Sequence, residues 1–319
     1  MQARCPICSN RENFKKLEQC GEFEILHCPD CDLQFSWPMQ PGDDQWYGAM
    51  YLVRHLAPDD RVREYHHWAL ENLPPKSKIL DLGCGEGAFV NYAAEQGFDA
   101  WGLDFSEAMI NAAKTRYPKA KFFVGTLDDF IKQHPGEKFD AVAMFEVVEH
   151  LSDPLKTIND TRGILAPGGS LLFSVPNRDR WPISDFGDNP PNHLTFWNET
   201  SLSNFIKSSG FDLRKIELTG RLFSMNALFS YCLTRFPLYA FLGLKSGYEG
   251  KTKLPAGKTK TGGHVLKLIK KQGPFLRRAR DLALWIPTLL FAPLVLPFTR
   301  GFNFMVLSRL EFPKPGDQT

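Results

Sequence analysis

Two cysteine pairs near the N-terminus have the residue type and spacing of a metal site. Cys5 and Cys8 form one Cys-x-x-Cys pair, Cys28 and Cys31 form another, and nineteen residues separate the pairs. Two such turns can place four thiolates tetrahedrally around one zinc ion, and this full shell leaves no position open for catalysis. Residues 1–40 therefore predict a structural zinc ribbon. The alternative is that one pair has lost its metal and that both turns survive as packing.

A glycine-rich loop at residues 81–87 has the pattern of a ligand-binding turn. It follows an apolar stretch, Lys78–Leu82, that predicts a buried strand. Glycines there allow a tight turn and let a ligand approach the backbone amides. Gly83 and Gly85 also satisfy one variant of the dinucleotide fingerprint, and Asp104 stands where a ribose-binding acid is expected for a nicotinamide or another nucleoside ligand.

Asp81 separates these alternatives, because a carboxylate just before the first glycine suits a ligand with a cationic amino group and would repel a pyrophosphate. Two later segments accompany it, residues 139–154 (FDAVAMFEVVEHLSDP) and residues 165–177 (LAPGGSLLFSVPN). Together the motifs resemble the class I S-adenosylmethionine-dependent methyltransferases, in the group related to the ubiquinone-biosynthesis O-methyltransferases. The resemblance covers residues 79–212. The N-terminal part is similar to a zinc-ribbon-bearing subgroup that is often tied to bacterial glycan or secondary metabolism.

This resemblance implies a set of cofactor-binding residues. Asp81, Gly83 and Gly85 would hold the methionine part of S-adenosylmethionine, and Asp104 would accept both ribose hydroxyls. Relatives commonly carry Asp where Thr126 stands, although a Thr hydroxyl could still accept a hydrogen bond from the adenine amine. The other implied contacts are Phe105 against the adenine, Leu127 beside Thr126 at the adenine edge, and Phe145 with Glu146 at the floor of the pocket.

Chemistry on the acceptor side needs few groups, because the sulfonium donor is already activated and the protein chiefly aligns the acceptor with the methyl group. A base is needed only where an acceptor hydroxyl must lose its proton. His193 lies after the fifth expected strand, where the family places acceptor-side residues. We expect it to contact the acceptor or act as the base, a role that the ordinary pKa of histidine permits. The alternative is a histidine that caps or staples its loop.

A second group of chemistry-bearing side chains follows the fourth expected strand. Glu146, Glu149 and His150 are spaced i, i+3 and i+4, which predicts one helical face. In ubiquinone-pathway relatives a similar set is associated with a divalent metal near the acceptor, and such a set suits metal binding. Glu146 and His150 are therefore further catalytic candidates. The alternative is hydrogen bonding within the fold, because many methyltransferases carry this motif without a metal.

Alternating apolar strands and helices must position these groups. We expect an α/β fold, a doubly wound, seven-stranded, Rossmann-like parallel sheet that binds ligands at the carboxyl ends of its strands. The expected strands are Lys78–Leu82, Asp99–Asp104, Lys121–Gly125, Phe139–Phe145, Ser170–Val175, Phe211–Thr219 and Phe302–Leu310. The expected domains are 1–40 (zinc ribbon), 41–75 (connector and lid helices), 76–221 (S-adenosylmethionine-binding core), 222–300 (apolar and basic insertion) and 301–319 (last strand and tail).

The charges that sum to +2 are unevenly distributed along the chain, because one insertion is strongly basic. Residues 245–280 carry eleven Lys or Arg against one acid, and the apolar stretches 222–244 and 282–299 flank them. Three prolines make residues 282–299 a poor membrane-spanning helix. We therefore expect a hairpin in the membrane interface, with basic side chains at anionic head groups. The alternatives are a folded cap over an acceptor pocket or at a dimer contact, a membrane span, and a nucleic-acid surface.

These observations predict an S-adenosylmethionine-dependent methyltransferase that acts on a hydroxyl of a lipid-linked glycan or hydrophobic small molecule at a membrane surface. The alternatives are an RNA methyltransferase that uses the basic insertion and a non-catalytic S-adenosylmethionine-binding adaptor. The first ten residues contain no apolar signal-peptide core, and the paired cysteines suit a reducing compartment. We therefore expect a cytoplasmic protein at the inner face of the membrane.

Overall fold

The computed structural model of this 319-residue chain describes residues 2–42, 61–180, 188–219 and 303–310. All described residues except Asp179 and Arg180 belong to one unit. Most of the expected insertion 222–300, with its membrane contact, and part of the expected connector lie outside the described residues. None of the helices in the described ranges combines the length and hydropathy of a membrane span.

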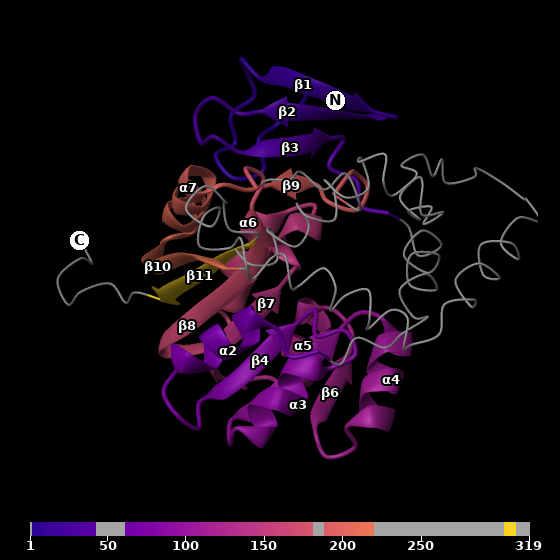
Figure 1. Ribbon diagram of the computed structural model, residues 1–319, viewed down its shortest axis with the longest axis vertical. Coiled ribbons are helices and arrows are strands. Elements are labelled where there is room, and N and C mark those ends of the chain that lie inside the picture. Colours follow the sequence, from indigo (N-terminus) through magenta and orange to yellow (C-terminus); the bar gives the residue numbers. More distant parts are fainter. Residues whose placement is uncertain (1, 43–60, 181–187, 220–302, 311–319) are drawn as a thin grey trace, which may run out of the picture. The chain divides into compact units, whose positions relative to one another are not determined.

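In the described part of the chain, seven strands form the central sheet, in the order β10-β11-β8-β7-β4-β5-β6 (Figure 1). The five strands from β4 to β8 run parallel, whereas β11 is antiparallel to both of its neighbours. The doubly wound sheet is confirmed, and its last strand corrects the expectation of a wholly parallel one. The strands are β4 (Lys78–Leu82), β5 (Asp99–Asp104), β6 (Lys121–Val124), β7 (Phe139–Phe145), β8 (Leu165–Pro176), β10 (Phe211–Thr219) and β11 (Asn303–Leu310).

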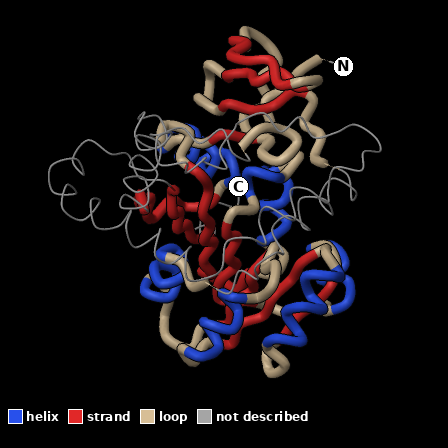
Figure 2. The backbone as a smooth tube through the Cα atoms, turned by 45° about the vertical axis from the view of Figure 1, so that its right-hand side comes forward, coloured by secondary structure: helices blue, strands red, loops and turns tan. Residues whose placement is uncertain are grey.

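Helices cover both faces of this sheet, which explains its nearly continuous apolar strands. Two buried clusters divide the strand residues by alternation, so that Ile79 and Leu80, or Leu171 and Leu172, belong to opposite clusters. Figure 2 shows the helices around the strands. One cluster includes side chains of α2 (Glu64–Glu71), α3 (Ala88–Glu95) and α4 (Glu107–Arg116), and the other includes side chains of α5 (Leu127–Gln133), α6 (Pro154–Thr161) and α7 (Glu199–Ser209).

Local chemistry fixes several helix starts. Ser106 caps α4, where its hydroxyl accepts a hydrogen bond from the backbone amide of Met109, as its residue type predicts. Asp153 caps α6 in the same way, and Pro154 occupies the first helical position, where the missing amide proton costs nothing. Within the expected connector, residues 61–73 have a helical sequence pattern, and the helix that it predicts is present as α2, shorter at both ends.

Among the described residues, a second sheet contains four antiparallel strands in the order β1-β2-β3-β9. The N-terminal region supplies β1 (Lys15–Cys20), β2 (Phe23–His27) and β3 (Gln34–Trp37), whereas the segment after β8 supplies β9 (Thr195–Phe196). The buried Phe35 of β3 belongs to the same apolar cluster as Trp197 and Phe205. We call residues 2–42 the ribbon; it shares both a sheet and a core with the segment 188–198.

The winding of the main sheet changes direction at β4, which lies between β5 and β7. The chain runs from β4 to β5 and β6 on one side and then returns to β7 and β8 on the other. In open α/β sheets, ligands bind in the crevice outside the carboxyl ends of the strands at such a switch point. The loop after β4 and the turn after β7 both lie at this edge.

Candidate functional site

The loop after β4 packs so closely against neighbouring side chains that it requires glycine at two positions. Gly83, Gly85 and Gly87 have φ angles of 81°, 53° and 81°, in the left-handed region. A Cβ on Gly83 would lie 2.5 Å from Cγ2 of Val147, and one on Gly87 would lie 2.5 Å from Cζ of Phe122. The loop therefore touches the turn after β7 directly, and no larger residue fits at either position without displacing a neighbour.

Asp81 is a buried carboxylate at the end of β4. Its side chain is 4% exposed, and its Oδ1 has no hydrogen-bond partner among the described residues. Burial, and secondarily the charge of Asp104, raise the pKa of Asp81 to about 8. A buried carboxylate normally has a compensating partner. The cationic amino group of a ligand would supply one, so Asp81 fits the methionine end of S-adenosylmethionine.

Asp104 fixes the neighbouring turn and keeps capacity for a ligand. Its Oδ2 accepts a hydrogen bond from the amide of Gly85 at 3.0 Å, and its Oδ1 accepts one from the amide of Ser106 at 2.8 Å. Burial raises the pKa of Asp104, and these backbone hydrogen bonds oppose the shift. A carboxylate accepts about four hydrogen bonds, so both ribose hydroxyls can still bind. The next residue, Phe105, is 62% exposed and offers a ring face for an adenine.

Thr126 has a structural task that the sequence did not reveal. It caps α5: its hydroxyl donates to Oδ2 of Asp129 at 2.6 Å and accepts from the amide of Asp129 at 3.2 Å. The predicted adenine contact of this hydroxyl therefore competes with the helix cap and stays a prediction. The side chain of Leu127 is buried in an apolar cluster. Only the backbone of this residue is available for the predicted adenine edge.

Tyr65 and Phe89, which the sequence did not single out, line a pocket with Asp81, Gly83 and the predicted floor residue Phe145. Within this pocket Tyr65 stacks on Phe145 at 5.3 Å between ring centroids, and Phe89 meets Phe145 edge-on at 4.7 Å. Aromatic faces attract cations, so this wall suits both the sulfonium and the ammonium of the donor. The helical pattern of residues 61–73 predicted α2 but not which of its sides faces the loop. The complete lining is Tyr65, His66, Asp81, Gly83, Cys84, Glu86, Ala88, Phe89 and Phe145.

Two histidines from distant parts of the chain, His150 and His193, lie side by side. The rings of His150 and His193 lie 4.8 Å apart at 74°, and Nδ1 of His193 lies 3.4 Å from Oδ1 of Asp188. Nδ1 of His150 lies 2.6 Å from the carbonyl oxygen of Asn192. A carbonyl only accepts, so this nitrogen carries the proton and Nε2 of a neutral His150 is the basic atom. Glu149 joins them: one ligand atom from each of Glu149, His150 and His193 lies within 4.8 Å of the others.

The expectation that Glu146, Glu149 and His150 share one helical face is wrong, whereas the catalytic role of Glu146 stays a prediction. No helix connects these residues, because β7 ends at Phe145, Glu146 has a φ of 56°, and only the 3-10 turn η1 (Val148–His150) follows. Glu146 instead accepts a hydrogen bond from the Ser174 hydroxyl at 2.9 Å. In the structure His193, rather than Glu146, lies with Glu149 and His150. One carboxylate with two imidazoles is a donor set that suits a first-row divalent ion.

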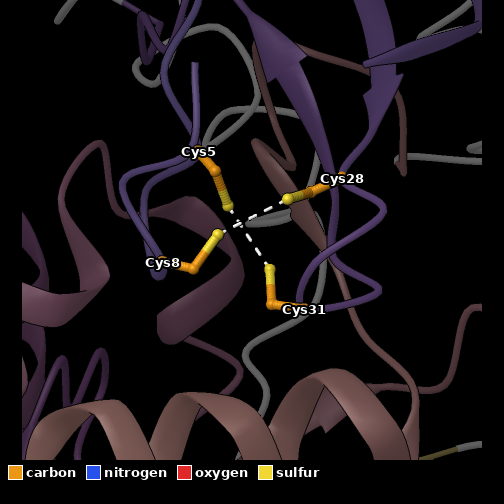
Figure 3. A group of neighbouring side chains, drawn as sticks. All are labelled: Cys5, Cys8, Cys28 and Cys31. Carbon is orange, nitrogen blue, oxygen red and sulfur yellow. Dashed lines mark hydrogen bonds between the residues drawn. The ribbon is translucent and has the colours of Figure 1, made fainter. Parts of the chain in front are cut away.

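The four predicted zinc ligands converge on one point (Figure 3). Sγ of Cys5 lies 3.4 Å from Sγ of Cys31, Sγ of Cys8 lies 3.5 Å from Sγ of Cys28, and all four sulfurs lie within 4.8 Å of one another. Zn–S bonds of about 2.3 Å in a tetrahedron place sulfurs about 3.8 Å apart. A hydrogen bond from Cys31 lowers the pKa of Cys5 to about 6, whereas burial raises the pKa of Cys8. A bound zinc ion would hold all four sulfurs as thiolates. The cluster therefore fits a structural zinc ion.

Comparison with known proteins bears on the same region. Residues 53–216 match the family model described as a methyltransferase domain. A probable S-adenosylmethionine-dependent methyltransferase from Mycolicibacterium smegmatis is 32% identical over 137 residues, which cover 42% of this chain and 52% of that protein. The ubiquinone biosynthesis O-methyltransferase of Histophilus somni is 33% identical over 110 residues, which cover 32% of this chain and 46% of that protein. The chain thus spans about half the length of the curated relatives it matches.

Among solved structures, a SAM-dependent methyltransferase from Archaeoglobus fulgidus is 17% identical and has a TM-score of 0.48, over 83% of this chain and 100% of that chain. The family match, by contrast, spans just over half of this chain and includes β4 to β8 together with the loop at residues 81–87. The chain therefore belongs to the methyltransferase domain family and has the Rossmann-like sheet of the class I S-adenosylmethionine-dependent methyltransferases.

Proposed function

We propose that this protein binds S-adenosylmethionine at the loop 81–87 and transfers its methyl group to an acceptor on the side of His150 and His193. The observation that carries this proposal is the buried Asp81, whose Oδ1 has no partner among the described residues at the switch point of the sheet. The amino group of the donor would lie at Asp81 and its ribose at Asp104. The relatives named as methyltransferases support this assignment.

The donor supplies an electrophilic methyl group on sulfur, so the residues of the chain bind, orient and deprotonate. Tyr65, Phe89 and Phe145 line the donor pocket and would orient the cationic donor. His193 would remove the proton of an acceptor hydroxyl, and the charge of Asp188 near its Nδ1 would stabilise the protonated ring. The basic Nε2 of His150 is the alternative base that would receive this proton.

The acceptor we propose is a hydroxyl of a lipid-linked glycan or hydrophobic small molecule at a membrane surface. The O-methyltransferase names of several relatives and the paired histidines support oxygen as the methylated atom. The apolar and basic sequence of residues 222–300 supports the membrane surface. A divalent ion held by Glu149, His150 and His193 would activate the same hydroxyl in place of a base.

We further propose that the cysteine cluster holds one Zn²⁺.

Titration calorimetry with S-adenosylmethionine tests the donor site first. We expect binding by the wild-type protein, and Asp104→Ala should weaken it by about 100-fold because two hydrogen bonds to a charged group are lost. The nearby exposed Asp128→Ala is the matched control and should bind normally. If the wild-type protein does not bind S-adenosylmethionine, the proposal is wrong.

Label transfer then separates the acceptor classes. Cell extract is incubated with methyl-labelled S-adenosylmethionine and the protein, and is divided into membrane, soluble and RNA fractions. We expect the label in an organic-solvent extract of the membranes and its loss in His193→Asn. Label in RNA with strongly salt-dependent binding would favour the RNA methyltransferase. Donor binding without transfer to any fraction would favour the adaptor.

A further inference from the structure

The ribbon and the acceptor side share a short stretch of backbone. β9 (Thr195–Phe196) pairs with Gln34 and Phe35 of β3, so the segment that follows β8 completes the ribbon sheet (Figure 1). Just before β9, the carbonyl oxygen of Leu194 accepts a hydrogen bond from the amide of Ser36 at 2.8 Å. The ribbon therefore holds the residue next to His193 by main-chain hydrogen bonds.

The same residue also holds the turn after β7. The amide of Leu194 donates to the carbonyl oxygen of Glu149 at 2.7 Å, and the carbonyl of Asn192 accepts from the ring of His150 at 2.6 Å. The two backbone groups of Leu194 thus point to different partners, one in the ribbon and one in η1. A displacement of the ribbon strand would move His193 relative to His150.

Asp32, the residue after the last cysteine ligand, ties the ribbon to both ends of this segment. Its Oδ1 accepts hydrogen bonds from His27 and from Nη2 of Arg178, each at 2.8 Å, and its Oδ2 accepts one from Asn198 at 2.7 Å. Nη1 of Arg178 donates in addition to the carbonyl oxygen of Asp32. We call Asp32 with His27, Arg178 and Asn198 the Asp32 clamp.

Arg178 and Asn198 lie at the two ends of the segment that carries His193. The amide of Arg178 donates to the carbonyl of Trp197 at 2.8 Å, which joins the two ends of the segment. Asn198 caps α7, because its side-chain oxygen accepts a hydrogen bond from the amide of Ser201. One ribbon carboxylate therefore fixes the start and the end of the acceptor-side segment. None of these contacts reaches the cofactor loop at residues 81–87.

We propose that the ribbon is a positioning element of the methyl-transfer site, and that Asp32 is the residue through which it holds the segment 192–196 and His193 in register with His150. This inference rests on the proposed methyl transfer but concerns the acceptor side alone. Alignment is what a methyltransferase chiefly supplies, and a displacement of about 1 Å can cost about 100-fold in rate. Weakening the clamp should therefore slow transfer and leave donor binding unchanged.

The variant Asp32→Asn tests this proposal with little change of shape. Asp32 has a φ of 61°, and Asn tolerates this left-handed backbone. Its amide has one accepting oxygen and one donating nitrogen, so the three side-chain donors of the clamp cannot all be satisfied. Asp30→Asn is the matched control, because Asp30 lies in the same turn, exposed to solvent.

Three measurements are made on the full-length protein. Amide hydrogen exchange of the peptide covering residues 192–197 should become about tenfold faster in Asp32→Asn, because the local opening free energy falls. The rate of label transfer from saturating S-adenosylmethionine into cell extract should fall by about tenfold or more. The dissociation constant for S-adenosylmethionine, the exchange of the loop 81–87 and the zinc content should equal those of Asp30→Asn.

Unchanged exchange of residues 192–197 in Asp32→Asn would overturn the proposal, as would faster exchange with a normal transfer rate. If Asp32→Asn does not fold, Arg178→Lys replaces it, because Lys keeps the charge but cannot contact both the carboxylate and the carbonyl of Asp32. If the wild-type protein binds the donor but transfers no methyl group, the proposed function is wrong, and the exchange data alone decide whether the clamp exists.

Discussion

The raised pKa of Asp81 makes the stability of the folded protein depend on pH. The pKa of this carboxyl is raised to about 8, whereas an aspartate in an unfolded chain titrates near 3.9. The folded protein therefore holds the proton more tightly than the unfolded chain does. The stability that Asp81 contributes is complete below about pH 4 and is lost as the pH rises to about 8.

Asp81→Asn should consequently stabilise the protein while it impairs function. In the absence of S-adenosylmethionine we expect the unfolding temperature to rise by several degrees at pH 8 and by less at pH 5, because only the charged carboxylate is penalised by burial. Affinity for S-adenosylmethionine should fall by about tenfold or more, because a charged hydrogen bond is lost. Scanning and titration calorimetry measure both. A stabilisation equal at the two pH values would contradict the assigned pKa.

Single residues also show where sequence reasoning fails. The spacing of Glu146, Glu149 and His150 has a meaning only if the backbone is helical, and the left-handed φ of Glu146 removes that condition. For Thr126 the sequence shows the hydroxyl but not its use, which depends on Asp129 three residues later. Cysteine pairs are more predictable, because the short turn between two cysteines fixes their geometry locally.

At the scale of elements, the parallel strands and the glycine loop were predictable because their signals are local: apolar runs, turn residues and spacing. β9 was not, since two residues between loops have no periodicity and depend on a partner strand 160 positions away in the sequence. The meeting of His150 and His193 follows from this same pairing. The sequence therefore predicted the strands and the glycine loop of the donor side, whose cofactor contacts stay predictions, and left the geometry of the acceptor side to the structure.

The ribbon itself should depend on its metal. We expect one zinc per chain by mass spectrometry of the metal content. Chelation, or Cys28→Ser, should lower the unfolding temperature by several degrees, because metal binding contributes folding free energy. Cys20→Ser is the control, since Cys20 lies outside the cluster of four sulfurs. A zinc-free protein as stable as the wild type would show that the cysteine turns are packing alone.

For the whole molecule, the pairing of β10 with β11 places Thr219 opposite Asn303. The two strand ends that flank residues 220–302 in the sequence are therefore neighbours in the sheet. Replacing them by Asn-Gly, a natural two-residue hairpin turn, should leave S-adenosylmethionine binding and the unfolding temperature nearly unchanged. Cosedimentation with anionic phosphatidylglycerol vesicles should occur for the wild-type protein and be lost in the shortened one. Equal cosedimentation of the two proteins would contradict the membrane role proposed for this segment.

The position of β11 also bears on how the protein is made. This strand lies between β8 and β10 in the sheet, yet it follows both in the chain. At about 5–20 residues per second on the ribosome, several seconds pass between the synthesis of β10 and that of β11. During this interval the apolar edge of β8, with Leu171, Leu172 and Phe173, has no neighbour on one side. An open edge of this kind invites pairing with other chains, so the nascent protein should need chaperones most before β11 emerges.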